Sequence, residues 1–131
     1  KSVNEVRLFN LKDTLLRAPY GQQLFDGIVE DNTTLEELTV IKEQLSTEGK
    51  KYLQALKDEN LEAILSINNY HSGFAAVAKY PTITVPMGYK NSGEPISLTF
   101  IGIPFTERKL LEIGYAFEQL TKVRKMPKNY Q

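Results

Sequence analysis

A short polar stretch, residues 68–72, holds the side chains of this sequence that are best suited to chemistry. It brings together two amides, a phenol, an imidazole and a hydroxyl, from Asn68, Asn69, Tyr70, His71 and Ser72. The residues just before it, 60–67, form a nearly continuous apolar run, which is typical of a strand covered on both faces. Because open α/β sheets bind ligands beyond the ends of their strands, the stretch is a candidate binding loop.

The same stretch has a plainer interpretation as an ordinary loop, since Asn, Ser and Gly are the residues of which turns are made. His71 is the only histidine and the chain has no cysteine. A metal site would therefore need carboxylates, and no spacing of Asp or Glu indicates one. We expect no metal and no cofactor, and we interpret His71 as a structural or loop residue rather than as a general base.

Charge and composition exclude several classes of protein. The 131 residues include 16 basic and 16 acidic side chains, so no net charge attracts nucleic acid over a distance. No apolar run approaches the ~20 residues of a membrane-spanning helix, and the start lacks the apolar core of a signal peptide. The absence of cysteine excludes disulfides and thiol catalysis. We therefore expect a cytoplasmic protein that binds neither nucleic acid nor membrane.

Two strands are expected after the polar stretch. Apolar residues alternate with Thr or Pro over 82–88, and a similar alternation follows over 96–102, which is the period of a strand with one buried face. The Asn-Ser-Gly turn at 91–93 separates them, so they should form a hairpin. Pro86 cannot donate a sheet hydrogen bond, which places it at the end of a strand or on an edge strand.

Helices are expected on both sides of these strands. Ser2 and Glu5 fit a capping box at the start of an apolar helical stripe that Pro19 should end, and a short helix follows over 20–29. Thr33 and Glu36 fit a second capping box, which opens a helix to about residue 58. The inward side of this helix should consist of Leu38, Ile41, Leu45, Tyr52, Leu53 and Leu56.

Two further helix signals complete this pattern. Gly49 costs the long helix about 1 kcal/mol relative to Ala, so the helix can bend or break there. A last helix should begin after an N-cap at Thr106 and end before Pro127, which cannot continue it. Basic residues over 122–125 suit the negative end of its dipole.

Several motifs, found in the same order, resemble the C-terminal end of the amidase signature family. They are Tyr80-Pro81, Ile-Thr-Val-Pro-Met-Gly over 83–88, Gly-Glu-Pro over 93–95, Leu-Thr-Phe-Ile-Gly over 98–102 and Tyr-Ala-Phe-Glu-Gln over 115–119. The sequence departs from the family at Lys79 and Met87, where Gly and Ala are usual. The resemblance implies an α/β fold, namely the C-terminal portion of the amidase signature fold, with a small mixed sheet flanked by helices.

Members of that family are serine hydrolases that cleave carbon–nitrogen bonds of linear amides through a Ser–cis-Ser–Lys triad. The triad lies in a Gly/Ser-rich region of a much longer chain. This sequence has no Gly-Gly-Ser-Ser run and no Ser-x-x-Lys spacing, and Ser66, Ser72, Ser92 and Ser97 are isolated serines. We therefore assign no catalytic residue here, place the catalytic set upstream, and expect this segment alone to be inactive.

The resemblance also gives the polar stretch a role, because a similar strand in the family brings a loop toward the mouth of the active site. It implies that residues 68–72 contact a small-molecule amide substrate in the full-length enzyme. Residues 1–131 would form a single segment, with helices over about 2–58 and strands and the final helix over about 60–126. Its partner would be the N-terminal catalytic part of the same protein.

Two alternatives to an amidase segment stay open at this point. The first is a non-catalytic oligomerisation or binding domain, and the second is a segment of an amidotransferase subunit. A segment cut from its catalytic half should leave strand edges and apolar helix faces uncovered. If it is stable alone, we expect a homo-oligomer.

Overall fold

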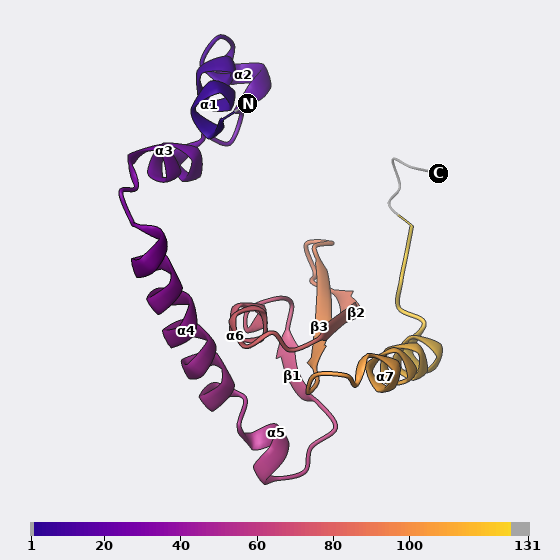
Figure 1. The fold of residues 1–131 in the computed structure, drawn as a ribbon. Coiled ribbons are helices and arrows are strands. Elements are labelled where there is room, and N and C mark those ends of the chain that lie inside the picture. The colour runs from indigo at the N-terminus through magenta and orange to yellow at the C-terminus, as the bar shows by residue number, and fades with distance from the viewer. Residues whose placement is uncertain (1, 127–131) are drawn as a thin grey trace. The chain divides into compact units, whose positions relative to one another are not determined.

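The structure is a computed structural model that describes residues 2–126 (Figure 1). The chain divides into two compact units, residues 1–38 and 39–131. The elements, in chain order, are α1 (Val3–Asn10), α2 (Thr14–Arg17), α3 (Gln23–Glu30), α4 (Leu35–Tyr52), α5 (Ala55–Asp58), β1 (Ile64–Ile67), α6 (Ser72–Ala78), β2 (Thr82–Tyr89), β3 (Pro95–Ile101) and α7 (Glu107–Thr121).

The first unit consists of short helices. The capping box of α1 is confirmed, because the Glu5 backbone N–H donates to Ser2 Oγ and the Ser2 N–H donates to the Glu5 carboxylate. The expected single helix up to Pro19 is wrong. Asp13 accepts a hydrogen bond from the Leu16 N–H and caps a separate helix, α2, since a short acidic side chain competes well for helix N–H groups.

The capping box of α4 lies one residue later than expected. Thr34, rather than Thr33, exchanges hydrogen bonds with the carboxylate and backbone N–H of Glu37. Thr33 is held instead by Asp31, whose carboxylate accepts from both the backbone N–H and the hydroxyl of Thr33. The sequence permits either register, and this local Asp–Thr turn decides between them.

Helix α4 continues through Gly49 without a break and ends at Tyr52, so the expected helix to about residue 58 is too long. Gly49 is buried, and a Cβ atom built on it would lie 2.6 Å from Val77 Cγ2 and 2.9 Å from the Phe74 carbonyl oxygen. The glycine therefore allows the close approach of α6. Only Leu53 and Leu56 of the expected inward side are buried, whereas Leu38, Ile41, Leu45 and Tyr52 are exposed.

The three strands form one antiparallel sheet in the order β1-β3-β2. The α/β class and the hairpin of the last two strands are confirmed, but the described strands contain no parallel pair, so the expected mixed sheet is wrong for this part of the chain. Pro86 lies on the edge strand β2 next to a bulge, where Met87 has no cross-strand partner. An edge strand tolerates the missing N–H of a proline.

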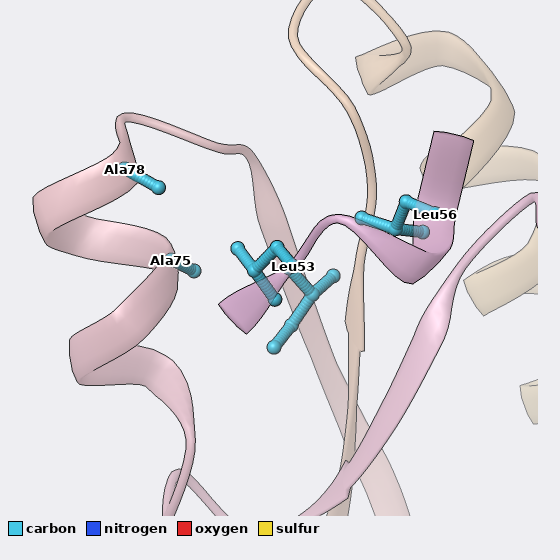
Figure 2. Close-up of a cluster of buried hydrophobic side chains, with 5 residues drawn as sticks. Leu53, Leu56, Ala75 and Ala78 are labelled. Carbon is cyan, nitrogen blue, oxygen red and sulfur yellow. The ribbon is translucent and has the colours of Figure 1, made fainter. Parts of the chain in front are cut away.

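Helices cover both faces of the sheet, with α6 on one side and α7 on the other (Figure 1). Ile101 belongs to the cluster formed by Leu53, Leu56, Ala75 and Ala78, which Figure 2 shows in close-up. The adjacent residue, Phe100, points to the opposite face and packs with Val85 and Leu110. Alternation along β3 thus fills both cores, as the strand period requires.

Strand β1 is less covered than its sequence indicated. Leu65 and Ile67 pair with Phe100 and Leu98 in register, yet they are 58% and 53% exposed. The cluster under α7 draws on β2 and β3 and on Ala63, but on neither of these two side chains. The expectation of a strand covered on both faces is therefore wrong within residues 2–126.

The last helix begins at Glu107 as expected, but Thr106 does not cap it with its side chain. Its hydroxyl donates to the Ile103 carbonyl at 2.6 Å instead of accepting a helix N–H. The helix ends at Thr121, because Lys122 takes a left-handed backbone with φ 47°. Pro127, the expected stop signal, lies outside the described residues.

Candidate functional site

The candidate loop begins where β1 ends, and a strained residue makes the turn. Asn68 has φ 51°, in the left-handed region that asparagine enters more readily than other residues with a Cβ atom. The backbone then runs into α6, whose first residue is Ser72. The loop therefore joins an edge strand to a helix, and its position beyond the strand end agrees with the sequence pattern.

Asn68 ties the start of the loop to the neighbouring strand. Its backbone N–H donates to the Ser97 carbonyl (2.8 Å), and its side-chain Oδ1 accepts from the Ser97 N–H (2.9 Å) and the Ser97 hydroxyl (3.3 Å). Asn68 thus extends the β1–β3 ladder by one residue. Both hydrogen bonds that Asn68 Oδ1 accepts come from Ser97, so this oxygen is used within the protein.

Two threonines support the same turn from the sheet. Thr99 is 1% exposed, and its hydroxyl donates to the Asn68 carbonyl. Since a hydroxyl has one proton to give, Thr84 is the donor in the 2.7 Å contact between the two threonine hydroxyls. The chain from Thr84 through Thr99 to Asn68 satisfies buried polar groups that would otherwise be costly.

Ser66 fixes the far end of the loop. It is 4% exposed, its Oγ lies 2.8 Å from His71 Nδ1, and it accepts the His71 backbone N–H at 3.2 Å. The imidazole is also part of an aromatic stack: its centroid lies 6.2 Å from the Phe74 ring, which stacks on Tyr52 at 3.8 Å and 9°. One buried hydroxyl and one stack therefore set the place of His71.

The five predicted residues divide into two groups. Asn68 and His71 are half-buried and hydrogen-bonded, and the Ser72 hydroxyl donates to the Asn69 carbonyl at 2.7 Å. Asn69 is exposed, and Tyr70 is 72% exposed. The loop is therefore a rigid frame that presents the side chains of Asn69 and Tyr70 outward.

The Ser66–His71 pair has the distance of a serine with its base, but its surroundings do not suit nucleophilic attack. A nucleophile needs an approachable oxygen, and Ser66 Oγ is buried and already accepts a backbone N–H. The pair therefore has a structural role and holds the end of the loop in place. This agrees with the interpretation of His71 as a structural residue.

Lys90 contributes a positive charge near the loop. Its hydrogen bond to the Glu94 carboxylate (2.8 Å) and the negative charge of that carboxylate raise the pKa of Lys90. Burial lowers this pKa slightly, and the nearby Tyr70 raises it slightly. The lysine is therefore charged at neutral pH and paired with Glu94. Within residues 2–126 no group of three or more His, Cys, Asp or Glu side chains is placed to hold a metal ion.

None of the helices in the described part of the chain is both long enough and apolar enough to cross a membrane.

The supporting residues Ser66, Ser97 and Thr99 were not predicted as parts of the site. One signal was present for Ser66, which interrupts an apolar strand and must find a hydrogen-bond partner when buried. The roles of Ser97 and Thr99 depend on the β1–β3 register, which the sequence of β3 alone does not reveal. Tyr52 and Phe74 meet His71 only through tertiary packing.

Comparison with known proteins gives three informative matches, although no family model matches the sequence. A probable amidase from Arabidopsis thaliana is 36% identical over 116 residues, covering 83% of this chain and 22% of that protein. A glutamyl-tRNA(Gln) amidotransferase subunit from Thermodesulfovibrio yellowstonii is 42% identical over 50 residues, 38% of this chain and 10% of that protein. The crystal structure of an amidase family protein from Bacillus anthracis str. Ames has a TM-score of 0.86 and 40% identity, over 98% of this chain and 26% of that one.

The chain belongs to the amidase family and has the amidase signature fold, as its motifs indicated. It spans about a quarter of the length of the two amidases named above.

Proposed function

We propose that this chain is the C-terminal structural and substrate-pocket segment of an amidase that hydrolyses carbon–nitrogen bonds of linear amides. The observation that carries the proposal is the agreement of nearly the whole segment, 98% of the chain at a TM-score of 0.86, with part of a longer amidase family protein. The shorter amidotransferase match covers 38% of the chain. An amidase parent is therefore favoured over an amidotransferase.

The catalytic groups of such an enzyme would lie in the remainder of the protein. A Ser–cis-Ser–Lys mechanism uses a serine to attack the amide carbonyl, with backbone N–H groups that stabilise the oxyanion. The buried Ser66 is unsuited to this role, and the Ser72 hydroxyl is directed to the Asn69 carbonyl. We assign catalysis to residues upstream and none to residues 2–126.

The loop over 68–72 would form one wall of the substrate pocket. Its hydrogen bonds to Ser66, Ser97 and Thr99 hold the backbone in one conformation, which lowers the entropic cost of binding a substrate. The exposed Asn69 and Tyr70 offer an amide and a phenol, which can each donate to or accept from a substrate amide. Asn68 and Ser72 would mainly shape the wall, and His71 lies between them on the same loop.

The first test combines two measurements on the native polypeptide. Its intact mass is measured in the source cell, and its hydrolysis of amides is then assayed. We expect a chain longer than 131 residues that releases ammonia or an amine from simple linear amides, and no release by the 131-residue chain alone. Hydrolysis by the short chain that is abolished in Ser72→Ala would overturn the upstream assignment. A longer native chain that hydrolyses no amide in a broad panel would overturn the amidase function.

The pocket role has its own test in the active parent enzyme. Tyr70→Phe removes one hydroxyl and should raise KM about three- to tenfold, the worth of one hydrogen bond, with a smaller change in kcat. Asn69→Ala should act in the same direction. Tyr115→Phe is a matched control, because Tyr115 is also exposed but lies on α7, outside the loop. Equal kinetics of Tyr70→Phe and Tyr115→Phe would remove Tyr70 from the pocket.

Exposed apolar residues favour a second candidate function, a non-catalytic domain that self-associates. Leu65 and Ile67 lie side by side on the face of β1 that α7 leaves open, and β1 is an edge strand of the three-stranded sheet. An uncovered apolar edge strand is a common site of strand pairing.

Sedimentation of the isolated chain over a wide concentration range tests this second candidate. We expect a dimer or larger assembly, and a shift toward monomer in a Leu65→Lys, Ile67→Lys double variant, because charges oppose edge pairing. Leu15→Lys, at another exposed apolar position, is the control. Monomeric behaviour of the unchanged chain at high concentration would exclude self-association.

A further inference from the structure

The hydroxyl of Ser66 has three polar neighbours, and these determine where its proton lies. It accepts the His71 backbone N–H (3.2 Å), lies 2.8 Å from His71 Nδ1, and lies 3.5 Å from the Ile67 carbonyl oxygen. A hydroxyl donates one proton and accepts through two lone pairs. The 2.8 Å contact with Nδ1 lies within hydrogen-bond range, whereas donation to the Ile67 carbonyl oxygen at 3.5 Å is longer than an ordinary O–H···O bond. The geometry therefore favours a hydroxyl proton directed to Nδ1 over an Nδ1–H that donates to Ser66.

A neutral imidazole that accepts at Nδ1 bears its own proton on Nε2. We propose that Ser66 is a positioning residue that fixes His71 in the Nε2–H tautomer and thereby presents a hydrogen-bond donor at the wall of the substrate pocket. The ligand class is a carbonyl compound, in particular an amide that accepts through its oxygen. The ligand part of this inference rests on the proposed function, whereas the tautomer does not.

The surroundings of the ring support an outward Nε2. His71 is half-buried, and the structure gives Nε2 no protein partner among the described residues. The only buried side-chain nitrogen or oxygen without a partner in that part of the chain is Gln22 Oε1. Nε2 therefore reaches solvent rather than the interior.

The aromatic stack limits how the imidazole can turn. Tyr52 and Phe74 lie nearly parallel to it, at 15° and 22°, with centroids at 6.0 Å and 6.2 Å. Because Ser66 holds Nδ1 and the stack restricts the plane of the ring, the direction of Nε2–H is set before a ligand arrives. Such preorganisation is what a recognition donor requires.

Nuclear magnetic resonance of a ¹⁵N-histidine-labelled protein at about pH 8, where an unperturbed imidazole is neutral, tests the tautomer directly. His71 is the only histidine of the 131 residues, and His71→Gln assigns its signals in any longer native polypeptide. We expect the proton on Nε2, with Nδ1 showing the shift of an acceptor nitrogen. A proton on Nδ1, or a mixture close to that of free histidine, would overturn the proposal.

Variants of Ser66 test its part in fixing the tautomer. Ser66→Ala should shift the tautomer population toward that of free imidazole, and Ser66→Thr, which keeps the hydroxyl, should restore the Nε2–H form. Ser72→Ala is the matched control, because the Ser72 hydroxyl bonds the Asn69 carbonyl and not the ring. An unchanged tautomer in folded Ser66→Ala would refute the positioning role. If that variant does not fold, the unchanged protein and Ser66→Thr still decide.

Kinetics of the parent amidase test the contact with substrate. His71→Phe keeps a ring for the stack but has no donor, and it should raise KM about three- to tenfold with a smaller effect on kcat. His71→Gln, whose side-chain nitrogen can occupy the place of Nε2, should recover most of this loss. Equal KM values would overturn the contact with substrate. Absence of any amidase activity would overturn the proposed function and that contact, while the tautomer measurement would stand by itself.

Discussion

Asn68 and Ser97 are joined by three hydrogen bonds, two of which converge on the Asn68 side-chain oxygen. This pair ends the β1–β3 ladder and turns the chain into the candidate loop. Asn68 is suited to the position for two reasons, since it tolerates the left-handed backbone at φ 51° and its amide replaces a strand carbonyl as acceptor.

Substitutions at Asn68 should separate these two effects. Asn68→Gly keeps the backbone freedom but leaves the Ser97 N–H without its acceptor, which should cost about 1–3 kcal/mol of unfolding free energy. Asn68→Ala should cost about 1–2 kcal/mol more, because it adds left-handed strain. Urea denaturation measures both values. Asn69→Ala, at the exposed neighbour, is the control, and a fully stable Asn68→Gly protein would contradict the bonding role.

Gly49→Ala should destabilise the protein although alanine is the better helix former. The added Cβ would meet Val77 Cγ2 at 2.6 Å and the Phe74 carbonyl oxygen at 2.9 Å, and overpacking of this kind costs about 1–3 kcal/mol. Gly27→Ala in α3 is a matched control, because nothing lies within 4 Å of its added Cβ. The control should be stabilised by up to about 1 kcal/mol. Thermal unfolding that ranks the two variants in the reverse order would refute the close approach of α6.

Lys79→Gly should stabilise the protein. Lys79 ends α6 with φ 61°, and a left-handed residue with a Cβ atom costs about 1–2 kcal/mol relative to a conformation that glycine adopts freely. The amidase signature family usually has Gly at this position. We expect a gain of up to about 1 kcal/mol in urea denaturation, after the greater unfolded-state entropy of glycine is subtracted. Lys50→Gly, within α4, is the opposite control and should be destabilised, and a loss of stability in Lys79→Gly would contradict the argument.

The start of α4 should lose stability in acid. Hydrogen bonds from the backbone N–H and then the hydroxyl of Thr34 lower the pKa of Glu37 below its ordinary value. The unfolded chain therefore binds this proton more readily than the folded chain. The contribution is fully present above the unfolded glutamate pKa, about 4.3, and disappears as pH falls through the lowered folded pKa.

Hydrogen exchange or chemical shifts of residues 34–38, followed from neutral to acid pH, measure this effect. Glu37→Gln should remove the part of the pH dependence that arises from the box, whereas Glu36→Gln, beside it in the first turn, should not. Thr34→Ala should weaken the start of the helix by about 1 kcal/mol. If Glu37→Gln and the unchanged protein have identical acid profiles, the Thr34–Glu37 capping box is not the cause of the acid sensitivity of α4.

Much of the fold was predictable because its signals are local. Capping of α1 by Ser2 and the β2–β3 hairpin follow from residues within one turn or one strand of each other. The register of the α4 capping box was not predicted correctly, although its signal is also local. Thr33 and Thr34 are equally good caps, and the hydrogen bond that Thr33 donates to Asp31 selects between them. The amidase family was recognised from short motifs in order.

The sequence by itself determined the strand that leads into a polar loop, the residues of that loop and the family to which it belongs. Only the tertiary structure decided which loop side chains are tied down and which are exposed. Asn68 is bound by Ser97 and His71 by Ser66, whereas Tyr70 is left outward. The physical reason is that hydrogen bonding and burial depend on strand register and helix packing between distant residues, which local propensity does not specify.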